Sequence, residues 1–316
     1  MSATPTPSTS PLTMTNQVTS DSVSIAAVQF SCSPDPAVNL ARAIKLTREA
    51  AGNGAKIVCL PELFLTRYFC QTEDPANYAL AESVPGPTST IFAKLSAELD
   101  VSIVLSLFEK RTEGLYHNTA CVVDPVKGYL GKYRKMHIPD DPLFMEKYYF
   151  APGDLGVRIF ETQGIRLAVL ICWDQWFPEA ARLAALKGAQ VICYPTAIGW
   201  QPYEQESHGA AQYGAWETIQ RSHAVANGCF VVAVNRTGFE PTSPDGAHPE
   251  GIQFWGQSFI AGPDGVIMNQ AGQTDEGAVI ANLRLKAIPE QRHGWPFLRD
   301  RRTDVYAPLA GTLLDD

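Results

Sequence analysis

The chain lacks any long apolar segment, and no stretch reaches the ~20 residues that a membrane-spanning helix needs. It is also short of basic residues, with 25 lysines and arginines against 33 acidic residues and a formal net charge of −8. A nucleic-acid-binding surface needs basic patches, so this balance argues against one. We therefore expect no membrane segment and no nucleic-acid partner. The acidity could favour a cationic ligand, although in most acidic proteins it only favours solubility.

Several cofactor and metal motifs are missing. Cys-x-x-Cys pairs, Cys/His clusters with zinc-like spacing, and glycine-rich phosphate loops are all absent, so zinc and nucleotide binding have no support. The seven cysteines are an odd number in a long chain without an apolar signal segment. This favours reduced thiols in the cytoplasm over a disulfide framework. We expect a cytoplasmic protein without a metal or an organic cofactor.

The composition changes after the first twenty residues. Residues 1–20 are rich in Ser, Thr and Pro and contain neither arginine nor a long apolar run. They cannot bury enough surface to offset the entropy of ordering, and they match neither a secretory signal nor a transit peptide. We expect a disordered tail over 1–20. Turns and strands are spread evenly over the remainder, without a linker, so 21–316 is predicted to be one domain.

Helical and apolar strand-like stretches alternate early in the chain, and strand pairs joined by tight turns recur later. This pattern favours a layered α/β domain that is not purely parallel. The predicted helices span 36–51, 88–99, 178–186 and 216–227, and the predicted strands span 23–30, 56–60, 101–108, 115–123, 129–135, 157–160, 165–171, 191–194, 229–235, 254–260, 266–269 and 278–283.

Cys172 directly follows the apolar run 167–171, and Pro178 follows shortly after it. The run predicts a buried strand, and proline favours the first position of a helix. Cys172 is therefore expected on a sharp strand-to-helix turn, which lifts a nucleophile above the sheet beside backbone N–H groups. Without further context, a cysteine after a strand is more often a small buried apolar residue.

Two other segments give Cys172 a chemical context. Glu62 lies in L-P-E-L-F and Lys135 in K-Y-R-K-M-H-I-P, and each stands at the end of a predicted strand as Cys172 does in I-C-W-D. Reactive residues gather at such strand ends in open α/β sheets. A thiolate can attack a carbonyl carbon, a carboxylate can carry the proton, and an ammonium can stabilise the developing oxyanion. Together the three residues suit acyl transfer. The thiolate supplies the nucleophile and the ammonium supplies the charge stabilisation that a metal ion would otherwise provide.

These motifs resemble the nitrilase (carbon–nitrogen hydrolase) superfamily over residues 23–306. The resemblance implies that Glu62 is the general base, Lys135 the catalytic lysine, Cys172 the nucleophile and Glu146 the second glutamate. It also implies a four-layer αββα sandwich that pairs across a helical face into a homodimer or a higher homo-oligomer. Lys135 and the following helix N-terminus are expected to lower the pKa of Cys172.

The segments E-K-Y-Y-F, C-W-D-Q-W-F-P-E and Y-P-T-A-I-G look like the branch that acts on N-carbamoylputrescine. Relatives specific for carbamoyl amino acids often carry an arginine soon after the nucleophile, but here Asp174, Gln175 and Trp176 stand there. Because a carboxylate prefers arginine forks, a cationic or neutral tail fits better. The resemblance implies hydrolysis of N-carbamoylputrescine to putrescine, ammonia and carbon dioxide through a thioacyl-type intermediate on Cys172. Residues 201–218 depart from the branch's usual pattern.

Alternatives stay open at this point. The chain could be an amidase, a hydrolase of N-carbamoyl amino acids, or a non-catalytic scaffold, although the intact reactive residues argue against the last. His137 could form a dyad with Cys172, but a structural histidine is the preferred interpretation. The acids that could meet a substrate ammonium are Glu204, Glu206, Asp174 and Asp154. Side chains that could contact substrate, or could instead be core residues, are Trp173, Tyr68, Tyr149, Trp176 and Thr196.

Overall fold

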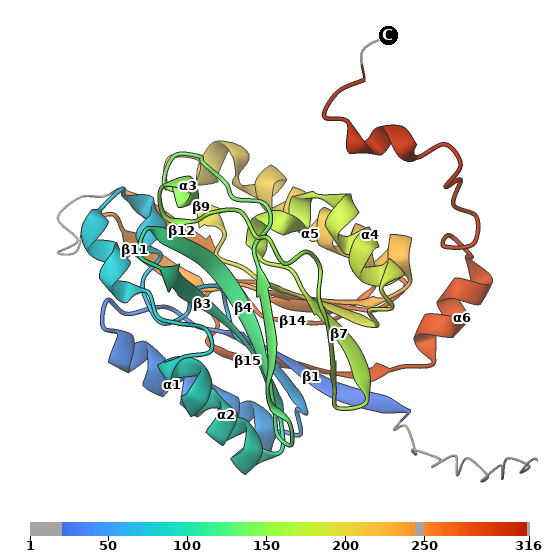
Figure 1. Cartoon of the computed structure of the whole chain (residues 1–316), viewed down its shortest axis with the longest axis horizontal. Helices are drawn as coiled ribbons and strands as arrows, with labels where there is room; N and C mark the ends of the chain where they lie inside the picture. Colours follow the sequence, from blue (N-terminus) through green and yellow to red (C-terminus); the bar gives the residue numbers. More distant parts are fainter. Residues whose placement is uncertain (1–20, 244–249, 315–316) are drawn as a thin grey trace, which may run out of the picture.

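A computed structural model describes residues 21–243 and 250–314 of the 316-residue chain. The predicted disordered tail over 1–20 lies outside these residues. The described chain forms two six-stranded sheets, a small three-stranded sheet, and helices on both outer sides of the large sheets (Figure 1).

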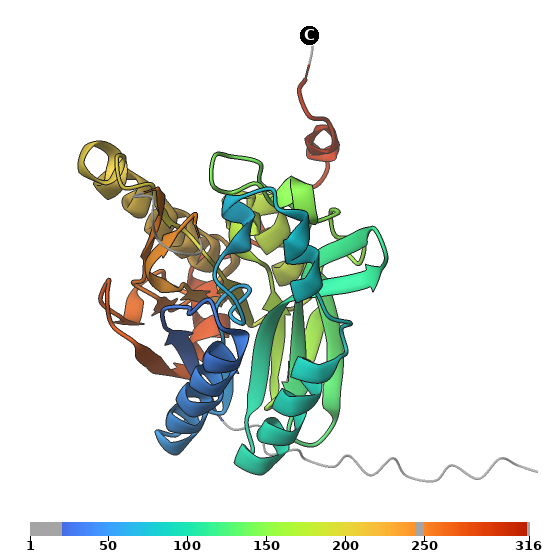
Figure 2. The same cartoon turned by 90° about the vertical axis from the view of Figure 1, so that its left-hand side faces the viewer.

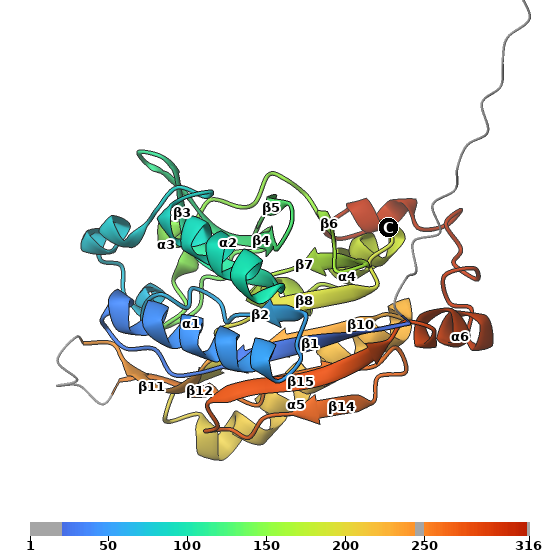
Figure 3. The same cartoon turned by 90° about the horizontal axis from the view of Figure 1, so that it is seen from below.

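The first large sheet has the order β15-β1-β2-β3-β4-β5. Strand β1 pairs parallel with β2, and β2 pairs parallel with β3, while the other pairs are antiparallel. The chain's first and last strands therefore lie side by side (Figure 3). The bounds are β1 Ser22–Gln29, β2 Ile57–Cys59, β3 Ser102–Thr112, β4 Leu115–Asp124, β5 Gly128–Arg134 and β15 Gly277–Arg284.

The second large sheet has the order β14-β13-β10-β8-β7-β6, with parallel pairing of β10, β8 and β7. Its bounds are β6 Ile159–Thr162, β7 Ile165–Val169, β8 Val191–Pro195, β10 Phe230–Val234, β13 Phe259–Ala261 and β14 Ile267–Gln270. The helices are α1 Pro36–Gly52, α2 Pro87–Leu99, α3 Glu146–Tyr149, α4 Pro178–Leu186, α5 Gln205–Asn227 and α6 Ala287–Gly294. Shorter 3₁₀ turns are η1 Phe69–Gln71, η2 Pro75–Leu80, η3 Cys172–Trp176 and η4 Ala307–Ala310.

Alternating side chains along the strands build two apolar layers. On β1, Ile25 and Ala27 pack into the core between the two sheets, whereas Ala26 and Val28 face the helix side. This alternation follows from the two-residue period of a strand. Helices α1 and α2 cover the first sheet, and α4 and α5 cover the second, on opposite sides of the pair (Figure 1). The predicted αββα sandwich is confirmed.

The structure differs from the sequence-based elements in two places near the site. The predicted strand 254–260 is split, because Gly256 and Gln257 both have positive φ (59° and 53°) and turn the chain between two sheets. Its first part belongs to a small sheet of β9 Gly199–Trp200, β11 Thr237–Pro241 and β12 Gly251–Trp255. Helix α5 also begins earlier than the predicted 216, at Gln205.

No helix among the described residues is long and apolar enough to cross a lipid bilayer. After α6 the chain stands away from the sheets as an arm over residues 295–314 (Figures 1 and 2).

Candidate active site

Glu62 follows β2 at the carboxyl end of the first sheet and is fully buried. Its Oε1 accepts hydrogen bonds from Asn118 Nδ2 at 2.7 Å and from Lys135 Nζ at 2.9 Å. Its Oε2 has no hydrogen-bond partner among the described residues. One oxygen is therefore fixed, and the other is free to accept a proton.

Lys135 follows β5 and is the cation of the cluster. Its Nζ donates to Glu62 Oε1 and to both oxygens of Glu146, at 2.8 and 2.7 Å, and all three side chains are fully buried. Its backbone is held by Lys135 N to Asn118 O at 2.9 Å and Gly153 N to Lys135 O at 2.8 Å. The ammonium is thus held between two carboxylates by charge-assisted hydrogen bonds, which are stronger than hydrogen bonds between neutral groups.

Cys172 lies where β7 runs into η3, at the end of the second sheet that faces the same region. Its φ is 42°, a left-handed conformation that is uncommon for residues other than glycine. The Sγ lies 3.9 Å from Ala197 O, and the residue is buried. The predicted sharp turn is present, although a 3₁₀ turn separates Cys172 from helix α4.

The electrostatics of the Cys172 thiol contradict the expectation of a lowered pKa. Burial raises its pKa well above the ordinary value, the charges of Glu62 and Glu146 raise it further, and Lys135 opposes them only in part. The expected helix N-terminus is also displaced, because α4 begins only at Pro178. The thiol is therefore protonated at neutral pH, and a base must accept its proton during attack.

The two charged partners have shifted pKa values of their own. Burial raises the pKa of Glu146 to about 7, although Lys135 pulls it down. Burial would lower the pKa of Lys135, but the carboxylates of Glu146 and Glu62 raise it well above its usual value. Lys135 is thus a permanent cation. Tyr68 supports Glu146 by donating from its hydroxyl to Oε1 at 2.7 Å.

A buried arginine fixes the segment that carries Glu62. Arg236 donates from Nη2 to the carbonyl oxygens of Glu62 at 2.5 Å and Leu63 at 3.1 Å, and from Nη1 to Thr66 O at 3.1 Å. Its charge is paired with Glu240 at 2.8 Å. Neither Arg236 nor Asn118 was predicted from the sequence. Asn118 could have been found from the 115–123/129–135 hairpin, because that pairing brings it beside Lys135.

A cavity of about 430 Å³ is lined by Cys172 and Glu146, whereas Glu62 and Lys135 lie behind its wall. The predicted contact residues Trp173 and Trp176 line it. Three other predicted contact residues do not lie on its wall. The Tyr68 hydroxyl donates to Glu146, and the Tyr149 hydroxyl donates to Thr72 O at 2.5 Å. Thr196 is buried, and its hydroxyl donates to Tyr194 O at 3.0 Å.

The rim of the cavity comes from two loops that sequence reasoning did not bring together. Gln201 Nε2 donates to Pro142 O at 3.1 Å and ties the loop between β9 and α5 to the loop before α3. Asp141 and Glu204, one from each of these loops, both line the cavity. Of the described side chains that line the cavity, none is basic. Contacts between loops that are far apart in the sequence leave no local signal in it. Of the two rim acids, the sequence therefore suggests only Glu204 as a ligand for a substrate ammonium.

The other three acids that could meet a substrate ammonium do not line the cavity. Asp174 is fully buried and away from the cavity wall. Asp154 is paired with Arg111 at 2.6 Å and Arg134 at 2.8 Å. Glu206 is exposed and does not line the cavity.

His137 forms no dyad with Cys172. Its Nδ1 lies 2.7 Å from Asp174 Oδ1, and its ring stacks on Phe177 with centroids 3.7 Å apart. The structural interpretation of this histidine is therefore supported. Within 21–243 and 250–314, no three His, Cys, Asp or Glu side chains gather in a way that could hold a metal ion.

Comparisons with known proteins agree with this geometry. An N-carbamoylputrescine amidase of Solanum lycopersicum is 43% identical over 91% of this chain and 94% of its own length. A citrullinase of Francisella tularensis is 35% identical over 90% of this chain and 96% of its own. The crystal structure of a carbon–nitrogen hydrolase from Helicobacter pylori superposes with a TM-score of 0.89 at 41% identity and covers 93% of this chain and 100% of its own.

The family model described as carbon-nitrogen hydrolase matches residues 24–293. This match spans both large sheets and every residue of the Glu62, Lys135, Glu146 and Cys172 cluster. The chain therefore belongs to the carbon–nitrogen hydrolase family.

Proposed function

We propose that this enzyme hydrolyses the terminal urea of a carbamoyl amine, with N-carbamoylputrescine as its substrate. The observation that carries the proposal is the cavity on Cys172, whose rim holds Asp141 and Glu204 and whose described lining has no basic side chain. The tomato relative is named for the same substrate, and the citrulline named by the Francisella relative also ends in a urea group.

In the first step, the sulfur of Cys172 attacks the urea carbon while its proton passes to Glu62. The free Oε2 of Glu62 is the acceptor, since Oε1 is occupied by Lys135 and Asn118. The oxygen gains negative charge, which the Lys135 ammonium and the Trp173 backbone N–H stabilise. One urea nitrogen then leaves with the proton that Glu62 returns, and a thiocarbamate remains on Cys172.

In the second step, water attacks the thiocarbamate while Glu62 accepts a proton from it. The carbon–sulfur bond breaks, the thiol of Cys172 regains its proton, and a carbamic acid is released. Loss of carbon dioxide from this acid gives putrescine, ammonia and carbon dioxide, whichever nitrogen leaves first. Glu146 holds the Lys135 ammonium in place throughout.

The walls and rim of the cavity match the remainder of the substrate. Trp173, Trp176 and Trp255 provide apolar surface for a tetramethylene chain. We assign Glu204 to the distal ammonium, because it lines the cavity and has no ion-pair partner within 21–243 and 250–314. An ammonium there would form a charge-assisted hydrogen bond.

Ammonia release from three substrates tests this proposal. N-carbamoylputrescine should be hydrolysed with a clearly higher kcat/KM than N-carbamoyl-β-alanine, whose carboxylate meets the acidic rim. Glu204→Gln should lower kcat/KM for N-carbamoylputrescine by about tenfold through loss of a charged hydrogen bond. The same variant should act on uncharged N-butylurea within about twofold of the wild-type rate, because that substrate makes no such bond.

Glu206→Gln is the matched control, since Glu206 is two residues away and outside the cavity. It should leave all three substrates unaffected. A preference for N-carbamoyl-β-alanine would reject the cationic substrate in favour of a carbamoyl-amino-acid hydrolase. Inactivity on all three substrates would reject the proposal, and a simple aliphatic amide assayed in the same way would then separate an amidase from a scaffold.

We also propose a cytoplasmic location. All seven cysteines, which lie within the described residues, are free thiols, as is usual in a reducing compartment.

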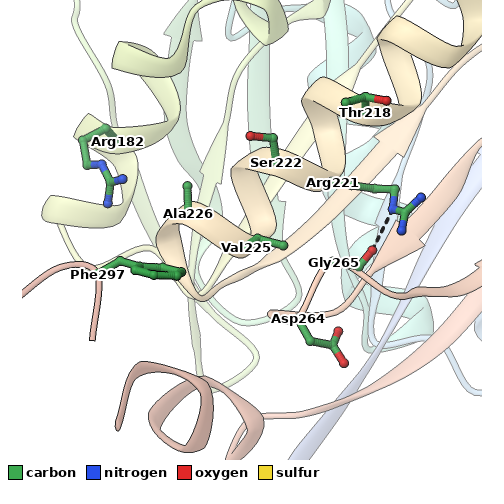
Figure 4. Close-up of a pocket in the computed structure, with 9 residues that line it drawn as sticks. All are labelled: Arg182, Thr218, Arg221, Ser222, Val225, Ala226, Asp264, Gly265 and Phe297. Atoms are coloured by element: carbon green, nitrogen blue, oxygen red, sulfur yellow. Dashed lines mark hydrogen bonds between the residues drawn. The ribbon is translucent and has the colours of Figure 1, made fainter. Parts of the chain in front are cut away.

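The enzyme is further proposed to be a homo-oligomer. A groove of about 660 Å³ runs along α5, between Arg182 of α4 and Phe297 of the arm (Figure 4). Nη1 of Arg182 is buried without a hydrogen-bond partner in the described chain. Apolar side chains are exposed on α4 and along the arm, namely Leu183, Leu186, Val305, Leu309, Leu313 and Leu314. Exposed apolar side chains of this number favour an interface that covers them.

Light scattering after size exclusion tests this assembly. The wild-type mass should be at least twice that of the 34.5 kDa chain. Leu186→Asp should shift it toward the monomer, because a charge would enter an apolar interface. Val126→Asp is the matched control, since Val126 is 88% exposed on the β4–β5 turn. A monomeric wild type would contradict the proposal.

A further inference from the structure

Asp174 is a fully buried carboxylate whose two oxygens are both occupied. Oδ1 accepts from the backbone N–H of His137 at 3.0 Å and lies 2.7 Å from His137 Nδ1. Oδ2 accepts from the Tyr133 hydroxyl at 2.7 Å and from the backbone N–H of Ile171 at 2.9 Å. Two donors are backbone N–H groups, and that of Ile171 is buried, so it is costly to leave unpaired.

These partners flank the two reactive residues that come from different sheets. Tyr133 and His137 stand two residues before and after Lys135, at the end of β5 in the first sheet. Ile171 and Asp174 stand on either side of Cys172, at the end of β7 in the second sheet. One carboxylate thus ties the lysine segment to the cysteine turn across the gap between the sheets.

The arrangement has no other evident use. Neither Asp174 nor His137 lines the cavity, and the hydrogen bonds of Asp174 go to Tyr133, His137 and Ile171, not to the side chains of the charged cluster. The His137 ring is fixed against Phe177, and the Tyr133 hydroxyl also accepts from Met136 N at 3.2 Å. Every described donor around Asp174 therefore belongs to a segment that carries Lys135 or Cys172.

We propose that Asp174 is a positioning residue that sets the placement of the Lys135 ammonium relative to the Cys172 sulfur. It acts through the backbone on both sides and touches no reacting atom. Because an asparagine can offer acceptor lone pairs on only one of its two terminal atoms, its amide NH₂ must face at least one buried N–H donor. The two segments would then separate or rotate. This inference rests on the proposed roles of Lys135 and Cys172.

The full-length Asp174→Asn variant tests it by steady-state kinetics with N-carbamoylputrescine. A displacement on the order of 1 Å between reacting groups costs about 10²-fold in rate. We therefore expect kcat to fall about 100-fold, with a much smaller change in KM, since Asp174 itself does not line the cavity. Tyr133→Phe, which removes one of the four hydrogen bonds, should lower kcat by a smaller factor with the same KM.

Asp124→Asn is the matched control for the loss of a buried carboxylate. Asp124 is buried, and it accepts from Thr162 and from the backbone N–H groups of Val126 and Lys127 at the β4–β5 turn, which does not line the cavity. It should lower the melting temperature without lowering kcat by more than about threefold. An Asp174→Asn enzyme that keeps the wild-type kcat would overturn the inference. If that variant does not fold, an unchanged kcat in Tyr133→Phe would do so.

Failure of the inference is distinguishable from failure of the proposed function. A wild-type enzyme that does not hydrolyse N-carbamoylputrescine rejects the function. An active wild type whose Asp174 and Tyr133 variants lose kcat only in proportion to the unfolded fraction rejects the positioning role.

Discussion

Replacing Cys172 with alanine is expected to abolish turnover, with kcat lowered by at least about 10⁴-fold. The proposed reaction passes through a covalent bond to the sulfur, and no other cysteine and no serine, threonine or lysine is among the described residues that line the cavity. Stability should change little, because Cys172 is small and its sulfur makes one long contact, 3.9 Å from Ala197 O. Ammonia release measures the loss, and melting temperature measures the fold.

Cys193→Ala is the matched control for this variant. Cys193 is equally buried on β8, in the core between the sheets, and makes no contact with the charged cluster in the described structure. It should keep kcat within about threefold. Mass spectrometry of acid-quenched wild-type enzyme should find an adduct on the peptide that contains Cys172. An alanine variant that retains more than a trace of activity would exclude the covalent mechanism.

Replacing Lys135 with methionine should have the second largest effect. The variant loses the ammonium proposed to stabilise the oxyanion, so kcat should fall by about 10³-fold. It also leaves Glu62 and Glu146 buried without their cation. Breaking a buried ion pair by removing one partner costs about 3–5 kcal/mol of unfolding free energy. Kinetics and chemical denaturation measure the two effects separately.

The stability lost in Lys135→Met should depend on pH. Burial already places the pKa of Glu146 at about 7, and loss of Lys135, which lowers it, would raise it further. A carboxyl group with a raised folded pKa stabilises the protein below its unfolded pKa, and this contribution is lost as pH rises through the folded value. The deficit relative to wild type should therefore be larger at pH ~8 than at pH ~5.

Lys132→Met is the matched control, because Lys132 lies on the same strand and binds Glu109 and Val84 O instead of the cluster. It should change kcat by less than about threefold. A Lys135→Met enzyme with kcat within tenfold of wild type would contradict the electrophilic role.

The places of Glu62, Lys135 and Cys172 could be predicted from the sequence because each stands at the end of a predicted strand. The resemblance then supplied Glu146, whose position on the four-residue helix α3 has no periodic signal. The alternation of helical and strand-like stretches predicts a layered α/β domain, and the resemblance supplied the αββα sandwich. The early start of α5 and the three-stranded sheet were missed, because β9 has two residues and the 254–260 run is broken by two residues with positive φ.

The remaining differences come from properties that appear only once the chain is folded. The pKa of Cys172 is raised because desolvation and two carboxylates outweigh Lys135, a balance that depends on burial. Tyr149 and Thr196 stand in promising motifs, yet their hydroxyls are engaged elsewhere. Asp141 and Glu204 line the same cavity because a hydrogen bond from Gln201 to Pro142 joins their two loops, which are distant in the sequence.

The bridge from Gln201 to Pro142 also bears on how such an enzyme can diverge. The cluster of Glu62, Lys135 and Cys172 is carried by strand ends and is tied to the cores of both sheets. The acidic rim is carried by surface loops, where substitutions and insertions are tolerated. Substitutions in the rim loops can therefore change the substrate preference of such an enzyme while Glu62, Lys135 and Cys172 stay the same.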